Sequence, residues 1–181
     1  MDLYVQFGLD TLNLGDGGDV GNGDLFLIFF NRFITENEDL PALAGWAEMR
    51  IPSGDGSSGV DGDFALNLTR SFGDLWRLHS FGKLKTLNGS RGAEEEADRR
   101  SFGWEAGAGV DYLVTEQTVG VLNYIHGSSE KEGSRDFNIL GLGLVHTLSQ
   151  RNHLKLALNY KLNGDAEAPN FAAKIQWAYA F

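Results

Sequence analysis

The side chains with the clearest chemical potential in this sequence are oxygen donors in a glycine-rich stretch near the N-terminus. Closely spaced carboxylate and amide oxygens on a flexible backbone are the ligands that Ca²⁺ prefers. The candidates are Asp16, Asp19, Asn22 and Asp24. A solvated acidic loop with no bound metal is the alternative interpretation of the same stretch.

A second group of residue types fits hydrolytic chemistry. His126 is followed by Ser128 and Glu130, and Asp136 comes soon after. A serine, a histidine and a carboxylate can form a nucleophilic site in which the histidine takes the serine proton. However, the sequence has no Gly-x-Ser-x-Gly motif, and Ser128 stands only two positions after His126. An enzyme is therefore the least favoured of the three functions that we consider for this sequence. A histidine at a membrane interface is the alternative for His126, and no cofactor is expected.

Charged residues also occur inside segments in which polar and apolar residues alternate. Successive side chains of a β-strand point to opposite faces, so this alternation predicts a sheet with one apolar and one polar face. Near 101–113, for example, Phe102, Trp104 and Tyr112 share one parity, whereas Glu105 and Asp111 share the other. The charged residues assigned to the polar face are Asp10, Glu48, Arg50, Lys83, Lys85, Glu105, Asp111, Lys155, Lys161 and Lys174.

Ten such segments position these residues, and together they predict an all-β chain. They lie near 2–12, 25–35, 42–52, 63–73, 77–87, 101–113, 117–127, 136–148, 152–162 and 170–181. The connections are alternately long and short, which is typical of an antiparallel up-and-down transmembrane barrel with long outer loops and short periplasmic turns. Eight strands is the alternative, if 63–73 and 77–87 belong to a loop region.

The last segment carries a resemblance to a known class of proteins. Trp177, Tyr179 and the terminal Phe181 follow apolar residues at every second position. This pattern resembles the C-terminal assembly signal of bacterial outer-membrane β-barrel proteins. The resemblance implies insertion by the outer-membrane assembly machinery, but it does not imply a particular activity.

Composition is compatible with this interpretation. The chain has 181 residues, enough for one domain over 1–181, and it has no cysteine for disulfides or thiolate metal sites. A net charge of −10 argues against a nucleic-acid partner. We expect a monomer in the bacterial outer membrane that contacts lipid and lipopolysaccharide. Because no signal peptide precedes the first segment, we interpret the chain as a mature sequence with a start methionine.

Orientation decides between two folds. If the apolar faces contact lipid, the charged residues line the barrel interior; if the chain is a soluble sandwich or lipocalin-like barrel, the apolar faces point inward. The first arrangement is the prediction. It places Lys83 and Lys85 next to Glu105, and barrel closure would bring Lys174 near Gln6 and Asp10.

Two functions then follow for the interior. The lead hypothesis is a narrow porin-like channel for ions or small solutes, for which glycines at 103, 107, 109, 141 and 143 would leave room. The runner-up is a non-conducting barrel, structural or used for surface interactions, in which the charges pair and plug the interior.

Overall fold

The computed structural model describes residues 2–9, 22–53, 58–88, 99–164 and 170–179. These residues form strands and connections without a helix. The strands are β1 (Asp2–Leu9), β2 (Asn22–Ile34), β3 (Ala42–Ile51), β4 (Asp61–Phe72), β5 (Trp76–Thr86), β6 (Phe102–Thr115), β7 (Thr118–Gly127), β8 (Phe137–Ser149), β9 (Asn152–Asn163) and β10 (Phe171–Tyr179). Among the described residues, no helix is long and apolar enough to cross a membrane.

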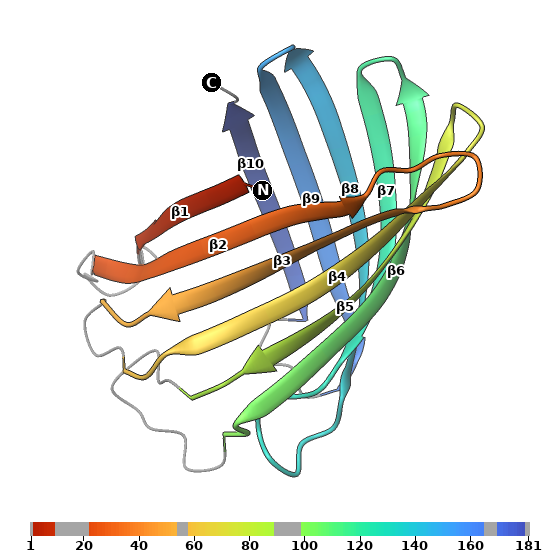
Figure 1. Ribbon diagram of the computed structural model, residues 1–181. Coiled ribbons are helices and arrows are strands. Elements are labelled where there is room, and N and C mark those ends of the chain that lie inside the picture. Colours follow the sequence, from red (N-terminus) through yellow and green to blue (C-terminus); the bar gives the residue numbers. More distant parts are fainter. Residues whose placement is uncertain (1, 10–21, 54–57, 89–98, 165–169, 180–181) are drawn as a thin grey trace.

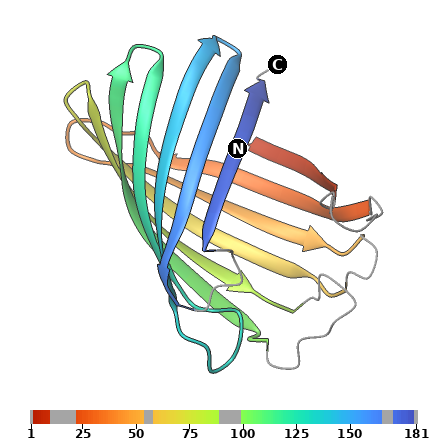
Figure 2. The same ribbon diagram turned by 180° about the vertical axis from the view of Figure 1, so that it is seen from behind.

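All strands belong to one antiparallel sheet in which each strand pairs with the next along the chain. The sheet is strongly twisted and curled, so that β1–β5 run at a steep angle to β7–β10 (Figures 1 and 2). The predicted antiparallel up-and-down arrangement is confirmed. The eight-strand alternative is wrong, because β4 and β5 pair continuously from Gly62 with Thr86 to Phe72 with Trp76.

Closure of the sheet is not part of the described structure. Among the described residues, every contact between strands joins sequence neighbours, and β1 makes none with β10. The expected placement of Lys174 beside Gln6 and Asp10 therefore has no counterpart here. Lys174 instead lies opposite Ala157 of β9, and Asp10 is outside the described residues.

The connections follow the predicted alternation. Residues 35–41, 73–75, 116–117 and 150–151 form short connections at one end of the strands, and the longer connections lie at the other. Gly73 adopts a φ of 62° in the turn between β4 and β5, a left-handed conformation that favours glycine. We call the two ends of the sheet the short-turn end and the long-loop end.

Pairing puts the charged residues of successive strands on a single face of the sheet. Glu48 lies opposite Asp63, which lies opposite Lys85, and Lys83 lies opposite Glu105. Because facing residues on paired strands project to the same side, one face collects these side chains. We call the face that carries Arg50, Lys83 and Glu105 the inner face, and the opposite one the outer face.

The outer face is apolar and exposed. Leu78 is 48% exposed and Ile175 is 76% exposed. Other exposed apolar side chains on this face are Phe64, Leu66, Leu68, Leu84, Leu122, Leu140, Leu142, Leu144, Leu156 and Leu158. By contrast, the buried apolar side chains among the described residues are only Ala65, Leu87 and Phe137. The soluble alternative, with apolar faces turned inward, is therefore not the arrangement that the structure has.

The accessible surface agrees with this distribution. The chain exposes 12231 Å², whereas a folded soluble protein of this mass exposes about 8,600 Å². Large contiguous apolar surface on a protein normally contacts another molecule or a membrane.

Aromatic residues lie near both ends of the outer face. Trp76 and Tyr112 are in ring contact at the short-turn end, with centroids 4.4 Å apart, and Phe102 is exposed at the long-loop end of β6. Phe102 and Tyr112 are ten residues apart on β6, a separation of about 33 Å along an extended strand.

The inner face is filled opposite two of its glycines. A Cβ on Gly107 would lie 2.4 Å from the Phe81 ring and 2.8 Å from the Tyr124 carbonyl oxygen, and one on Gly141 would lie 1.9 Å from Asn123 Oδ1. The prediction that these glycines leave room is therefore wrong at both positions, because a side chain from a neighbouring strand occupies the space.

We expect Gly107→Ala to lower the free energy of unfolding by about 1–3 kcal/mol, because the new methyl group overlaps the Phe81 ring and backbone. Gly82→Ala is the matched control, since a Cβ there meets no atom within 4 Å. Urea unfolding of the refolded protein in lipid vesicles measures both. Equal stability of the two variants would contradict this account of the packing.

Glu36 links the β2–β3 connection to β4. The Ser71 backbone N–H donates to Glu36 Oε1 at 2.6 Å, and the Ser71 hydroxyl donates to Oε2 at 2.9 Å. The backbone hydrogen bond, followed by the hydroxyl one, lowers the pKa of Glu36 below its ordinary value of 4.5. The folded state therefore favours the Glu36 carboxylate.

Because its folded pKa is the lower one, Glu36 stabilises the protein above pH 4.5, and this contribution disappears as the pH falls through the lowered pKa. We expect Glu36→Gln to reduce stability at neutral pH and the difference from wild type to shrink in acid. Urea unfolding across this pH range tests it, with Glu38→Gln in the same connection as control. A difference that stays constant with pH would be inconsistent with the bond to the carboxylate.

Candidate functional site

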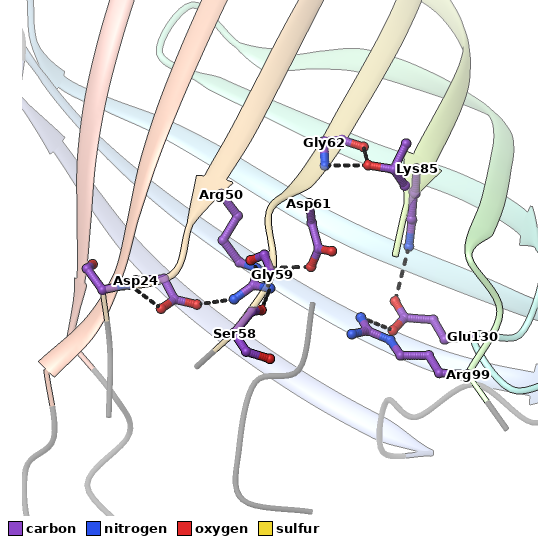
Figure 3. A network of polar contacts seen from close by, with 11 residues as sticks. Asp24, Arg50, Ser58, Gly59, Asp61, Gly62, Lys85, Arg99 and Glu130 are labelled. Carbon is purple, nitrogen blue, oxygen red and sulfur yellow. Dashed lines mark hydrogen bonds and ion pairs between the residues drawn. The ribbon is translucent and has the colours of Figure 1, made fainter. Parts of the chain in front are cut away.

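The most deeply buried charge cluster of the inner face is built around Arg50, near the long-loop end of β3. Arg50 is 2% exposed. Its Nε donates to Asp61 Oδ2 at 2.9 Å, and its Nη1 donates to Asp24 Oδ2 at 2.5 Å. Its Nη2 donates to the carbonyl oxygens of Ser58 and Gly59 at 3.1 and 3.3 Å (Figure 3). A buried guanidinium with this many partners is satisfied, so the cluster fastens β2, β3 and β4 together.

Asp24 lies in β2 and not in the first loop, where the sequence places it as a candidate calcium ligand. Both of its carboxylate oxygens accept hydrogen bonds, from Arg50 and from the Ser53 backbone N–H. Asp16 and Asp19 lie outside the described residues, as does the side chain of Asn22. Within the described parts of the chain, no group of three potential metal ligands is present.

A second cluster joins β4, β5 and β6. Lys83 Nζ lies 2.7 Å from Glu105 Oε2 and 3.7 Å from Asp63 Oδ2, and Lys85 forms an ion pair with Glu105 Oε1. The predicted pairing of both lysines with Glu105 is confirmed. Register produces it, because Lys83 is directly opposite Glu105 and Lys85 lies two residues further along β5.

The same cluster continues into the long loops. Lys85 Nζ lies 3.7 Å from Glu130 Oε1, and Arg99 Nη2 lies 3.2 Å from Glu130 Oε2 (Figure 3). Arg99 also pairs with Lys131 as an isolated β-bridge, so the described residues before β6 lie against the β7–β8 connection. These contacts hold the long-loop end of the inner face on the β5–β7 side.

A third cluster lies at the short-turn end. Asp111 Oδ2 lies 2.7 Å from His79 Nε2 and 3.0 Å from Arg77 Nη2, and His79 Nδ1 lies 2.9 Å from Thr69 Oγ1. A histidine between a carboxylate and a hydroxyl is also a catalytic arrangement. Here Thr69, His79 and Asp111 face one another across β4, β5 and β6, and the contacts satisfy the polar groups of these three side chains.

The hydrolytic group proposed from sequence is not assembled. His126 Nδ1 contacts the Phe137 carbonyl oxygen at 3.1 Å, and its ring lies edge-on to Trp104. Ser128 is buried, and its hydroxyl bonds the backbone N–H of Trp104 at 3.0 Å. His126 and Ser128 therefore contact different partners, and no hydrogen bond joins the two side chains among the described contacts.

The remaining predicted residues form a different wall of the inner face. Register places Lys155, Lys161 and Lys174 on the inner face of β9 and β10. Lys155 and Lys174 have no ion-pair partner among the described residues, whereas the lysines of β5 do. Glu48 lies on the inner face of β3 and is half-buried. The inner face therefore divides into a charge-neutralised part on β3–β6 and a positive part on β9–β10.

The terminal residues can be placed only in part. Trp177 of β10 is 65% exposed on the outer face. The side chain of Tyr179 and all of Phe181 lie outside the described residues.

Comparison with known proteins gives no family assignment, because no family model and no curated protein matches the chain.

Replacing Arg50 should be costly because Asp24 and Asp61 would stay buried and lose the guanidinium that both of them bind. We expect Arg50→Met to lower the free energy of unfolding by about 3–5 kcal/mol. Arg77→Met removes an inner-face arginine whose side chain is 51% exposed, and it should cost less than about 1 kcal/mol. Unfolding in vesicles measures both, and similar losses would mean that burial of the Arg50 cluster does not govern its energetics.

Proposed function

We propose that this chain is a bacterial outer-membrane β-barrel protein that forms a narrow channel for ions or small solutes. The observation that carries the proposal is the reversed distribution of side chains. An exposed apolar outer face and a charged inner face are stable when hydrocarbon surrounds the protein and polar groups line an axis.

Barrel closure is part of this proposal. The outer edges of β1 and β10 have no partner strand among the described residues. An open sheet edge leaves backbone N–H and C=O groups unpaired, and such groups are not tolerated in the hydrocarbon region. Pairing of β1 with β10 would satisfy both edges and join the aromatic residues into bands around the barrel.

A conducting path is favoured along one wall of the interior. The ion pairs of Arg50, Lys83 and Lys85 neutralise and fill the β3–β6 side. On the β9–β10 side, Lys155 and Lys174 have no ion-pair partner among the described residues and lie beside small residues, Gly143 and Ala157. Solutes would therefore pass beside β9 and β10 rather than through the centre.

The second candidate is a non-conducting barrel that serves the membrane or its surface. The filled spaces opposite Gly107 and Gly141, together with the ion-pair clusters, favour it. In either case we propose lipid, lipopolysaccharide and the assembly machinery as partners and the monomer as the working unit. His126 contacts a backbone carbonyl oxygen, and we do not propose an enzyme at this residue.

Insertion and conduction are tested on the same refolded protein. We expect the folded chain to require detergent or lipid, to migrate differently on gels before and after heating, and to give small current steps in a planar bilayer. Asp111→Asn, which weakens the Arg77 and His79 contacts at the short-turn end, should change the step size. A folded, monodisperse chain in plain buffer would refute the membrane proposal, and insertion with no current would favour the non-conducting barrel.

A further inference from the structure

The inner face carries a pocket of about 220 Å³ where β7, β8, β9 and β10 lie side by side. Three adjacent rows of paired residues form it. The middle row runs Val121, Gly143, Ala157, Lys174 across the four strands. Its central residues are glycine and alanine, so this row forms the floor of a hollow between the taller side chains on either side.

One flanking row supplies positive charge. Lys155 lies opposite Gln176, and Lys174 is the diagonal neighbour of Lys155 across the β9–β10 pair. Diagonal neighbours on paired strands are about 7–8 Å apart at the backbone, so two long side chains can reach one small ligand. None of the described residues that line the pocket is acidic, so the two ammonium groups face no local counter-charge from the described part of the chain.

The other flanking row supplies neutral polar groups. Asn123, Gly141 and Asn159 form it, and both asparagines line the pocket. Asn123 Oδ1 is buried and has no hydrogen-bond partner, the one such side-chain atom found among the described residues. A buried acceptor without a donor is costly. Asn123 Oδ1 lies against Gly141, and a rotation of the amide toward the pocket would let a ligand that carries an O–H group supply the donor.

We propose that this pocket binds a small oxyanion that also carries a hydroxyl group, of which inorganic phosphate is the simplest example. The two lysines attract the charged oxygens, and the ligand's P–O–H donates to Asn123 Oδ1. Chloride satisfies the lysines but not the asparagine, so the site distinguishes the two anions. The inference rests on the proposed channel function, because it names the solute class that the β9–β10 path would carry.

Equilibrium binding tests the site itself. The refolded full chain in micelles is titrated with sodium phosphate or sodium chloride at constant ionic strength and near-neutral pH, and NMR follows the side-chain amides of Asn123, Asn159 and Gln176. We expect saturable shifts with phosphate and weaker ones with chloride. Lys155→Gln and Lys174→Gln should each weaken phosphate binding about fivefold. Asn123→Ala should weaken phosphate binding while leaving chloride binding unchanged.

Arg151→Gln is the matched control, because it removes one positive charge from the exposed β8–β9 connection outside the pocket. It should bind phosphate as the wild type does. Unsaturable shifts, or equal weakening by Arg151→Gln and the lysine variants, would overturn the site, since a general surface-charge effect would then explain the response.

Bilayer currents under a phosphate gradient separate this inference from the channel proposal. Anion-selective current that is reduced in Lys155→Gln and Lys174→Gln supports both. Current without anion preference, together with no saturable binding, overturns the site and leaves the channel. Saturable binding without current overturns the channel and leaves a closed binding pocket.

Discussion

The structure depends on one geometric constraint, the continuous antiparallel register of its strands. Side chains alternate between faces along each strand, so a slip of one residue in any pairing would carry that strand's charges to the opposite side. The pairings of β3, β4, β5 and β6 contain no such slip at the charged residues, so these residues share the inner face. The irregularities within a pairing lie near strand ends, for instance between Arg32 and Ile34 and between Thr147 and Ser149.

Electrostatics and packing reinforce this register. Arg50 can satisfy Asp24 and Asp61 only if β2, β3 and β4 are in phase, and Glu105 meets two lysines only if β5 and β6 are. The Arg50 pairs are buried and the Glu105 pairs are largely buried, on the face that is away from the exposed apolar surface. Broken buried pairs leave uncompensated charge, which penalises alternative registers more strongly than apolar packing alone would.

Much of the fold could be predicted from sequence because period-two alternation is a direct consequence of strand geometry. The predicted segments correspond to the strands of the structure, with differences of a few residues at their ends. One such difference mattered: β2 begins at Asn22 rather than near 25, so Asp24 is a strand residue and a partner of Arg50 instead of a loop ligand. The glycines just before Asp24, Gly21 and Gly23, concealed that boundary.

The site was less predictable, because its features arise between strands. Lys83 and Lys85 could be matched with Glu105 from neighbouring segments. The contact of Phe81 with Gly107 and that of Asn123 with Gly141 depend on side-chain directions across a pairing, which composition does not encode. The same holds for Thr69, His79 and Asp111, which come together only when three strands are aligned.

The strictly sequential strand order also bears on how this chain acquires its structure. In the described part of the chain, each strand contacts only the strands that precede and follow it in sequence. Hairpins can therefore form one after another with little loop-closure entropy at each step. A seam between the first and last strands would be the single contact requiring the whole polypeptide, so it would be the slowest to form and the first to open.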